Sequence, residues 1–271
     1  MRQSDLLAAR TRRSSHTAAI DLRDDRQPAV EPLIETTETF ADLDVQADES
    51  RLEQFKTLTG RVAVVTGGAG EVGRAIAFAL LQAGARVCVL DHDADGLRAT
   101  AADAESAAPI VYLQCDLGSV ADIEGAAEFI ARFDRPVDVL VHGADCHVVA
   151  GVDGDVADLD EQYLLNVRGP YVLTQALGEQ LQAGPGHVVF LEEGLETVAD
   201  DLQYAITRAA VDAYASGLRE AVEDDAVRVT TVRHDRDVDP ADVADAVMGA
   251  VEMPPHLELA DVHIRAVDSP L

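Results

Sequence analysis

The sequence has almost no lysine, and this shortage affects how its other residues are interpreted. Lys56 is the only lysine among 21 lysine and arginine residues, whereas aspartate and glutamate together number 50. The formal net charge of −29 argues against nucleic acid or an anionic membrane as a partner, because both would repel such a chain. In a chain that avoids lysine, an arginine can also stand where a lysine would otherwise be expected.

Cysteines and long apolar runs are scarce as well. Cys88, Cys115 and Cys146 are odd in number and form no C-x-x-C pair. This pattern argues against a disulfide framework or a zinc site and predicts free, buried thiols. No apolar run approaches the ~20 residues needed to span a bilayer, and the first residues lack the apolar stretch of a secretory signal. We therefore expect a cytoplasmic protein without a metal centre.

The chain divides into two regions of different composition. Residues 1–50 begin basic, become acidic and show no sustained period. We expect a mostly disordered extension in which Ser4 caps a short helix. The extension is either a solvated tail or a segment that docks on a partner protein. Residues 51–271 are expected to form one folded domain, since apolar residues make up 48% of the chain.

Apolar, β-branched runs alternate with longer amphipathic segments from Gly60 onward. The seven runs are R-V-A-V-V-T, R-V-C-V-L-D, P-I-V-Y-L-Q-C-D, V-D-V-L-V-H, H-V-V-F-L, V-R-V-T-T-V and V-H-I-R-A-V. Helices are expected after the first strand and near 119–133, 158–183, 201–223 and 240–252. Seven strands alternating with helices predict an α/β domain with a Rossmann-type, doubly wound parallel sheet.

A glycine-rich loop, T-G-G-A-G-E-V-G, separates the first strand from its helix. Gly67 suits the tight turn, Gly70 the close approach of backbone to a pyrophosphate, and Gly73 the packing of helix on strand. Asp91 ends the second strand, where a carboxylate binds ribose hydroxyls and repels a 2′-phosphate. The pattern predicts a dinucleotide site that favours NAD over NADP, although Glu71 places a carboxylate inside the loop.

Tyr204 and Arg208 stand four residues apart in Y-A-I-T-R. On a helix this spacing places both side chains on one face, about one turn apart. The spacing alone does not separate a catalytic pair, in which the cation tunes the phenol, from two side chains of an amphipathic helix.

With these features in order, residues 58–271 resemble the short-chain dehydrogenase/reductase family. The glycine loop and D-V-L-V-H-G-A-D resemble segments of its extended branch, and Y-A-I-T-R resembles its Y-x-x-x-K helix. The resemblance implies that Asp116 and Leu117, in C-D-L, contact adenine and that Ala144 adjoins the cofactor. It also implies that Asn166, in L-L-N-V-R-G, is the catalytic asparagine, which holds a proton-relay water.

The chain departs from the family at the reaction centre. The family's tyrosine exchanges a proton during hydride transfer, its lysine lowers the tyrosine pKa, and its serine polarises the carbonyl. Here Tyr204 matches, Arg208 replaces the lysine, and Glu192 and Glu193 replace the serine pair. An ionised Glu193 about 4 Å from the substrate oxygen would oppose its developing charge by ~4 kcal/mol at an effective dielectric of ~20. The substrate-covering segment after the sixth strand is also nearly absent.

These departures predict a homologue that has lost ordinary hydride transfer, binds NAD weakly or has lost it, and acts as a structural or regulatory subunit. Two alternatives stay open. One is an active NAD-dependent oxidoreductase with Tyr204 as acid/base and Arg208 as its cation, and the other is lyase- or dehydratase-like chemistry using Glu192 and Glu193. By the resemblance, the helices near 158–183 and 201–223 would form the interface of a homo- or hetero-oligomer.

Overall fold

The computed structural model describes residues 57–104, 110–133, 135–195, 198–222, 225 and 227–267. The extension predicted at residues 1–50, with its helix at Ser4, lies outside the described residues. Within the described part, no helix is both long and apolar enough to pass through a membrane.

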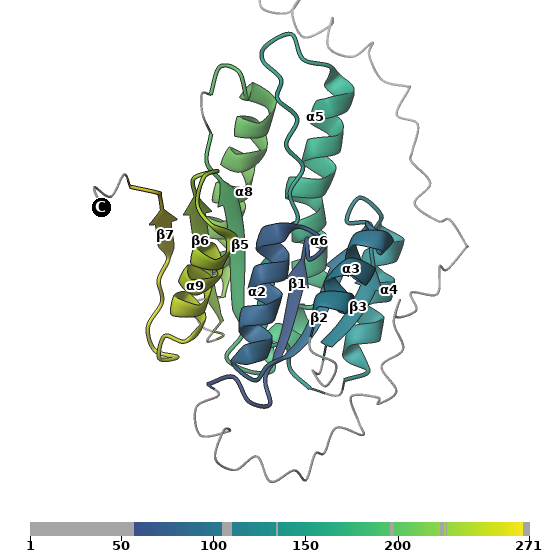
Figure 1. Cartoon of the computed structure of the whole chain (residues 1–271), viewed down its shortest axis with the longest axis vertical. Helices are drawn as coiled ribbons and strands as arrows, with labels where there is room; N and C mark the ends of the chain where they lie inside the picture. The colour runs from purple at the N-terminus through teal and green to yellow at the C-terminus, as the bar shows by residue number, and fades with distance from the viewer. Residues whose placement is uncertain are drawn as a thin grey trace, which may run out of the picture.

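One sheet of seven parallel strands forms the centre of the molecule (Figure 1). The strands are β1 (Val62–Thr66), β2 (Arg86–Asp91), β3 (Ile110–Gln114), β4 (Val139–His142), β5 (His187–Glu193), β6 (Arg228–His234) and β7 (Asp261–Ile264). Their order, β3-β2-β1-β4-β5-β6-β7, confirms the predicted doubly wound α/β domain. The direction of strand addition reverses between β1 and β4, which leaves a crevice at their carboxyl ends, where ligands bind in such sheets.

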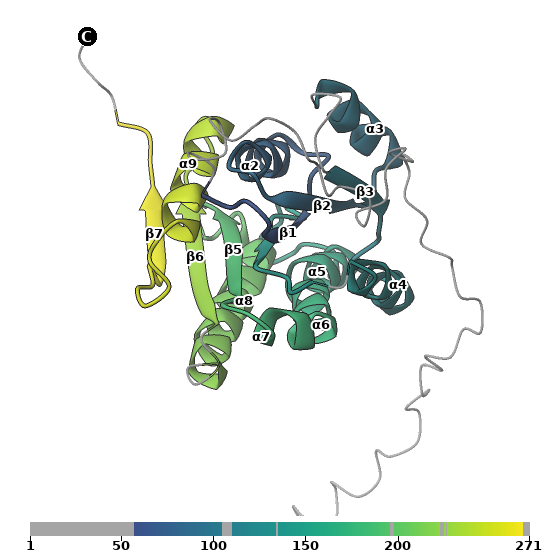
Figure 2. The ribbon, with the colours of Figure 1, turned by 90° about the horizontal axis from the view of Figure 1, so that it is seen from below.

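Helices cover both faces of the sheet (Figure 2). One layer holds α2 (Glu71–Gln82), α3 (Ala94–Asp103) and α9 (Pro240–Val251). The other holds α4 (Val120–Ala131), α5 (Val156–Tyr163), η2 (Leu164–Arg168), α6 (Gly169–Ala176), α7 (Gly178–Gln182) and α8 (Leu202–Ala221). Successive side chains of a strand point to opposite faces, so Val64 packs in one hydrophobic core and Val65 in the other. This two-sided burial explains why the strands are continuous apolar runs.

The helix predicted near 158–183 is divided into four segments. Leu164–Arg168 forms a π-helix, in which the Gly169 N–H donates to the carbonyl of Leu164. Pro170 has no N–H to donate to the carbonyl four residues earlier, which is that of Asn166. The Asn166 backbone carbonyl therefore lacks the N–H donor that an α-helix would supply four residues later. Such π-bulges frequently occur at functional sites.

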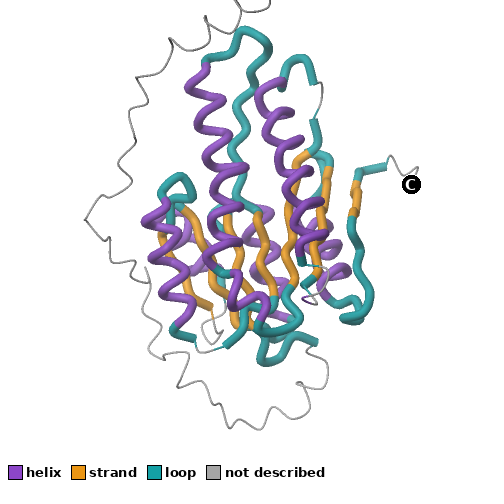
Figure 3. The backbone as a smooth tube through the Cα atoms, turned by 180° about the vertical axis from the view of Figure 1, so that it is seen from behind, coloured by secondary structure: helices purple, strands orange, loops and turns teal. Residues whose placement is uncertain are grey.

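Two connections determine what lies above the carboxyl ends of the strands. The segment after β4 runs between α5 and α8, and both helices extend past the carboxyl ends of the strands (Figure 3). On the other side, residues 235–239 alone join the end of β6 at His234 to the start of α9 at Pro240. The prediction that no long substrate-covering segment follows the sixth strand is thereby confirmed.

Candidate functional site

The glycine loop has the geometry that its sequence predicts. Gly67 has a φ of +77°, and a Cβ there would lie 2.6 Å from the Gly143 carbonyl oxygen. A Cβ on Gly73 would lie 2.2 Å from the Gly67 carbonyl oxygen. The turn and the close packing of α2 against β1 therefore require glycine at both positions. The N-terminus of α2, with its unpaired N–H groups, faces the same crevice.

A pocket of about 390 Å³ fills the crevice between β1 and β4. Gly67, Gly70, Asp91, Leu117 and Ala144, all expected at the cofactor, line it. Its position at the switch point and its glycine edge suit a dinucleotide.

Asp91 ties the end of β2 to the glycine loop. One carboxylate oxygen accepts a hydrogen bond from the Ala69 N–H at 3.0 Å, and the other accepts one from the Asp93 N–H at 3.0 Å. Oδ1 also lies 3.2 Å from His92 Nδ1, whereas Oδ2 keeps a second lone pair. Asp91 can therefore hold the loop in place and still accept hydrogen bonds from ribose hydroxyls in the pocket.

Two other acids of this region lie differently from what the sequence suggested. Asp116 is not among the described residues that line the pocket, because its carboxylate turns to accept the Gly118 N–H at 2.8 Å. Glu71 begins α2, is exposed and likewise does not line the pocket. The contact of Asp116 with adenine that the resemblance implied stays a prediction, and Glu71 is exposed to solvent.

Asp145 joins Tyr204 and Arg208. The Tyr204 hydroxyl donates to Asp145 Oδ2 at 2.6 Å, and Arg208 Nη2 forms an ion pair with Asp145 Oδ1. Tyr204 is 0% exposed and Arg208 8% exposed. Asp145, which follows β4, also lines the crevice pocket. The carboxylate therefore stands between the pocket and the tyrosine.

Contacts other than Asp145 hold the guanidinium of Arg208 in place. Nη1 donates to the Leu191 carbonyl at 3.0 Å, and the guanidinium carbon lies 4.6 Å from the centre of the Tyr204 ring. Its Nε is buried without a hydrogen-bond partner among the described residues. The four-residue spacing thus does place both side chains together on one face of α8, as predicted.

The environment raises the pKa of Tyr204 instead of lowering it. Burial is the largest cause, and the charges of Asp145 and Glu193 add to it, whereas Arg208 acts in the opposite direction. Arg208 does act to lower the Tyr204 pKa, but desolvation and a carboxylate at hydrogen-bond distance outweigh it, so the net shift is upward.

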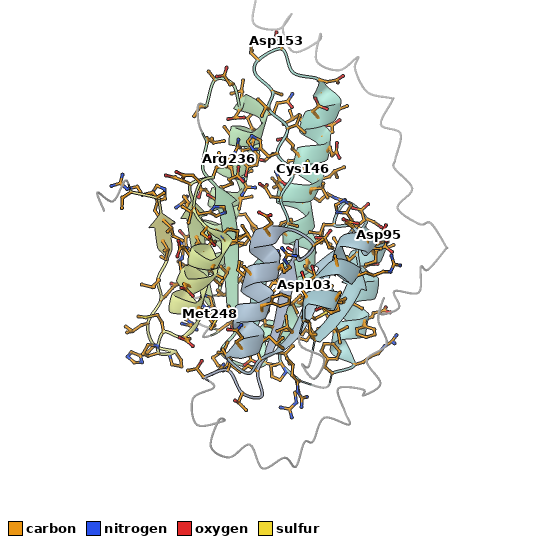
Figure 4. The ribbon with its side chains drawn as sticks, viewed as in Figure 1. Asp95, Asp103, Cys146, Asp153, Arg236 and Met248 are labelled. Carbon is orange, nitrogen blue, oxygen red and sulfur yellow. The ribbon has the colours of Figure 1, made fainter. Side chains whose placement is uncertain are left out.

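A second polar cluster covers the other side of the tyrosine. The His147 ring stacks on the Tyr204 ring with centroids 4.0 Å apart, and His147 Nε2 lies 2.8 Å from Asp201 Oδ1. Arg236, from the short β6–α9 connection, donates to Glu193 Oε1 at 2.6 Å and to His147 Nδ1 at 2.9 Å. In Figure 4, Arg236 and Cys146 lie beyond the carboxyl ends of the strands. The charge of Glu193 is thus paired by Arg236.

Glu192 points away from this cluster. Its Oε2 accepts a hydrogen bond from Arg233 Nε at 3.0 Å, and Arg233 also pairs with Asp212 and Asp261. Adjacent strand residues face opposite sides of a sheet. The structure therefore does not bring Glu192 and Glu193 together as an acid and base.

The Asn166 side chain lies beside the reaction centre, but its amide group is already hydrogen-bonded to other residues of the chain. Its Oδ1 accepts the Cys146 N–H at 2.8 Å, and its Nδ2 donates to the Cys146 carbonyl at 2.8 Å and to Thr207 Oγ1 at 3.3 Å. The side-chain amide fixes the segment that carries Asp145 and His147. No side-chain donor of Asn166 remains for a relay water.

Sequence reasoning missed Asp145, His147 and Arg236. Asp145 ends D-V-L-V-H-G-A-D, three residues after the last residue of β4, His142. Since the carboxyl ends of parallel strands meet at one edge of the sheet, a charged side chain there could have been placed near Tyr204. His147 and Arg236 lie in irregular segments, and no spacing or period identifies them.

Comparisons with known proteins agree with this geometry. Residues 61–234 match the family model of the short chain dehydrogenases. The chain is 31% identical over 193 residues to D-threitol dehydrogenase of Mycolicibacterium smegmatis, which covers 69% of this chain and 74% of that protein. It is 25% identical over 229 residues to an uncharacterized oxidoreductase of Staphylococcus aureus, covering 78% of this chain and 99% of the relative.

Solved structures show the same fold. A metagenomic short-chain oxidoreductase in complex with NADP superposes with a TM-score of 0.71 and 28% identity, covering 79% of this chain and 100% of that one. An alcohol dehydrogenase from the archaeon Thermococcus sibiricus, complexed with 5-hydroxy-NADP, has a TM-score of 0.72 at 19% identity, covering 78% and 98%. With the glycine loop, the parallel sheet and the Tyr204 helix all in place, the chain belongs to the short-chain dehydrogenase/reductase family.

Proposed function

We propose that the chain binds NAD(H) in the crevice between β1 and β4 without ordinary hydride transfer, and that it acts as a structural or regulatory subunit. The observation that carries this proposal is the hydrogen bond from Tyr204 to Asp145. A phenol that is 0% exposed and already donates to an internal carboxylate has no surface to offer a substrate. Its raised pKa also opposes its use as a base.

The binding half of the proposal rests on the crevice. Gly67 and Gly70 would lie against the pyrophosphate, with the N-terminus of α2 supplying backbone donors. Asp91 would accept ribose hydroxyls and repel a 2′-phosphate, which favours NAD. The related metagenomic enzyme was solved with NADP, and the proposed preference for NAD rests on the Asp91 carboxylate of this chain alone.

The catalytic half rests on what surrounds the tyrosine. Glu193 stands where the family has a hydroxyl donor, and losing one donor to a developing oxyanion costs about 10²–10³ in rate. Arg236 and His147 occupy the space beside it. The connection 235–239 is only five residues long, so the described part of the chain has no long substrate-covering segment between β6 and α9.

A second candidate is an active NAD-dependent oxidoreductase. It is favoured by the carboxylate at 2.6 Å from the Tyr204 hydroxyl, which could accept the proton that Tyr204 takes from an alcohol. Relatives named as dehydrogenases or oxidoreductases agree with this candidate. The dehydratase-like alternative is not proposed, because Glu192 and Glu193 face apart.

For assembly, we propose that α6, α7 and α8 pack against a second subunit. A mainly apolar groove of about 480 Å³ runs between these helices, and Tyr171 at its edge is 51% exposed. Of the apolar side chains on the two helical ranges expected at the interface, Leu164 is exposed, whereas Val211 is buried in the chain's own core. The interface would therefore be centred on the groove and not on the inner face of α8.

Calorimetric titration with NADH and NADPH, together with turnover assays on a broad panel of alcohols and carbonyls, tests the function. We expect weak binding that favours NADH, and no turnover. Tyr204→Phe should leave cofactor binding and any cellular role unchanged. Turnover that Tyr204→Phe abolishes, in a protein that still folds and assembles, would establish the second candidate in place of the first.

A further inference from the structure

We propose that Tyr204 and Arg208 form a binding site for a small carboxylate, and that the Asp145 side chain is its internal occupant. The inference rests on the proposed function only in that it concerns a tyrosine not engaged in hydride transfer. The proposal assigns a class of ligand, small carboxylates, to Tyr204 and Arg208, which stand where the family has its catalytic tyrosine and lysine.

The two donors are arranged for one carboxylate. They project from a single helix one turn apart, and each donates to a different oxygen of Asp145. A carboxylate held by a guanidinium and a hydroxyl receives two charge-assisted hydrogen bonds, which are the stronger kind. The pair therefore recognises the carboxylate group as a unit.

The donors keep their positions without Asp145. Arg208 is fixed by the Leu191 carbonyl and by stacking over the Tyr204 ring, and the opposite face of that ring is covered by His147. Both donors are more than nine-tenths buried. Removing the Asp145 carboxylate would thus leave a preorganised pair of donors facing a vacant space.

The occupant comes from a different kind of element. Asp145 lies in the irregular segment between β4 and α5, its side chain is 27% exposed, and it lines the crevice pocket. An external carboxylate could therefore reach the vacated position through that pocket. Asp145→Ala removes the carboxylate and keeps Cβ, so the vacated space matches formate, and the methyl group of acetate would extend into the pocket.

Charge balance favours an anion at the vacated position. The other carboxylates near the pair already have partners: Glu193 is paired with Arg236, Asp201 with His147, and Glu192, whose pKa Arg208 also lowers, with Arg233. Without Asp145, the buried guanidinium of Arg208 would lose the one carboxylate among the described residues that is bonded to it, which is unfavourable in a protein interior. A bound acetate would restore neutrality and both hydrogen bonds.

The experiment measures acetate and formate binding to Asp145→Ala by calorimetry and by line broadening of labelled acetate, without nucleotide. The matched control is Asp153→Ala, an exposed acid at the tip of the same segment (Figure 4). We expect saturable acetate binding to Asp145→Ala, and none to the wild type or the control. Adding Tyr204→Phe should weaken this binding by about tenfold or more, because a hydrogen bond to a charged group is lost.

Chloride separates carboxylate recognition from binding of any anion. Equal affinity for chloride and acetate, or acetate binding that is equal in Asp145→Ala and Asp153→Ala, would overturn the proposal. Asp145→Asn fills the space without charge and should not bind acetate.

If Asp145→Ala does not fold, the ionisation of Tyr204 in Asp145→Asn tests the pairing, and it is followed by ultraviolet absorbance. Adding Tyr204→Phe to Asp145→Asn shows which part of the absorbance change belongs to Tyr204. Tyr204 should then ionise at lower pH than in the wild type, and an unchanged titration would refute the pairing.

The two proposals fail separately. Turnover by the wild-type chain would overturn the proposed function. Absence of acetate binding by a folded Asp145→Ala variant would overturn the carboxylate site, whatever the wild type does with NAD.

Discussion

Replacing Asp145 with alanine should destabilise the protein far more than its partial exposure suggests. The substitution removes the ion-pair partner of Arg208, which is 8% exposed, and the acceptor of the buried Tyr204 hydroxyl. Breaking a buried pair on one side costs ~3–5 kcal/mol. Because the Asp145 side chain is 27% exposed, water entering from the crevice should solvate Arg208 in part. We therefore expect a loss of about 3 kcal/mol.

The assay is thermal and urea unfolding of the purified full chain. A loss of about 3 kcal/mol corresponds to a fall in Tm of roughly 6–12 °C for a domain of this size, with an unchanged dependence on urea. The control Asp153→Ala should remain within about 0.5 kcal/mol of the wild type. Moderate salt should be present throughout, so that the net charge is screened.

A double-mutant cycle with Arg208→Met isolates the pair. Methionine keeps much of the volume of arginine without the charge, so the double variant should be less destabilised than the sum of the two single variants. We expect a coupling of about 2 kcal/mol. Additive losses, or an Asp145→Ala variant as stable as the Asp153→Ala control, would refute the ion pair as the central contact of the site.

Four further outcomes are expected. Asp91→Ala should weaken NADH binding about tenfold or more in calorimetry, since it loses hydrogen bonds to ribose. Glu193→Ser should restore no measurable turnover in a carbonyl panel, because the tyrosine stays blocked. Burial lowers the pKa of His142 to about 3 from its usual 6.5. The unfolded chain therefore binds the extra proton, and stability should fall as the pH drops from 6.5 toward 3, less steeply in His142→Gln. Tyr171→Arg should shift the assembly toward monomer in sedimentation, and an unchanged mass would exclude the groove as the interface.

The fold could be predicted because its signals are local. Each strand is a short β-branched run that must be buried on both faces, and each connection returns through a helix, which leaves a parallel sheet as the consistent arrangement. The roles of Gly67 and Gly73 followed from the same local reasoning, since a turn and a close contact both exclude a Cβ. The π-helix at Asn166 was missed, because it depends on how Pro170 and Gly169 fit against a distant segment.

The site could be predicted only in part. The spacing of Tyr204 and Arg208 predicted that both side chains lie on one face of a helix. Their shared partner, Asp145, is 59 residues from Tyr204 and 63 from Arg208 in sequence, so no local pattern indicates it. The like charge expected from Glu193 is instead balanced by Arg236, 43 residues further along. Such pairings are set by which strand ends meet at one edge of the sheet and by loop conformation, and neither is encoded in a local pattern.

The five-residue connection 235–239 has a consequence for the rate at which a bound nucleotide would be released. In enzymes with a mobile covering segment, release of a bound nucleotide must wait for that segment to open. Here residues 235–239 alone lie between β6 and α9, so release of a nucleotide from the crevice would not wait for a segment at this position, and its direct contacts would weigh more in its residence time. Weak contacts would make exchange fast, and occupancy would follow the surrounding concentration of NAD(H) with little delay. Under the proposed function, such a chain would report a changing nucleotide level instead of storing the nucleotide.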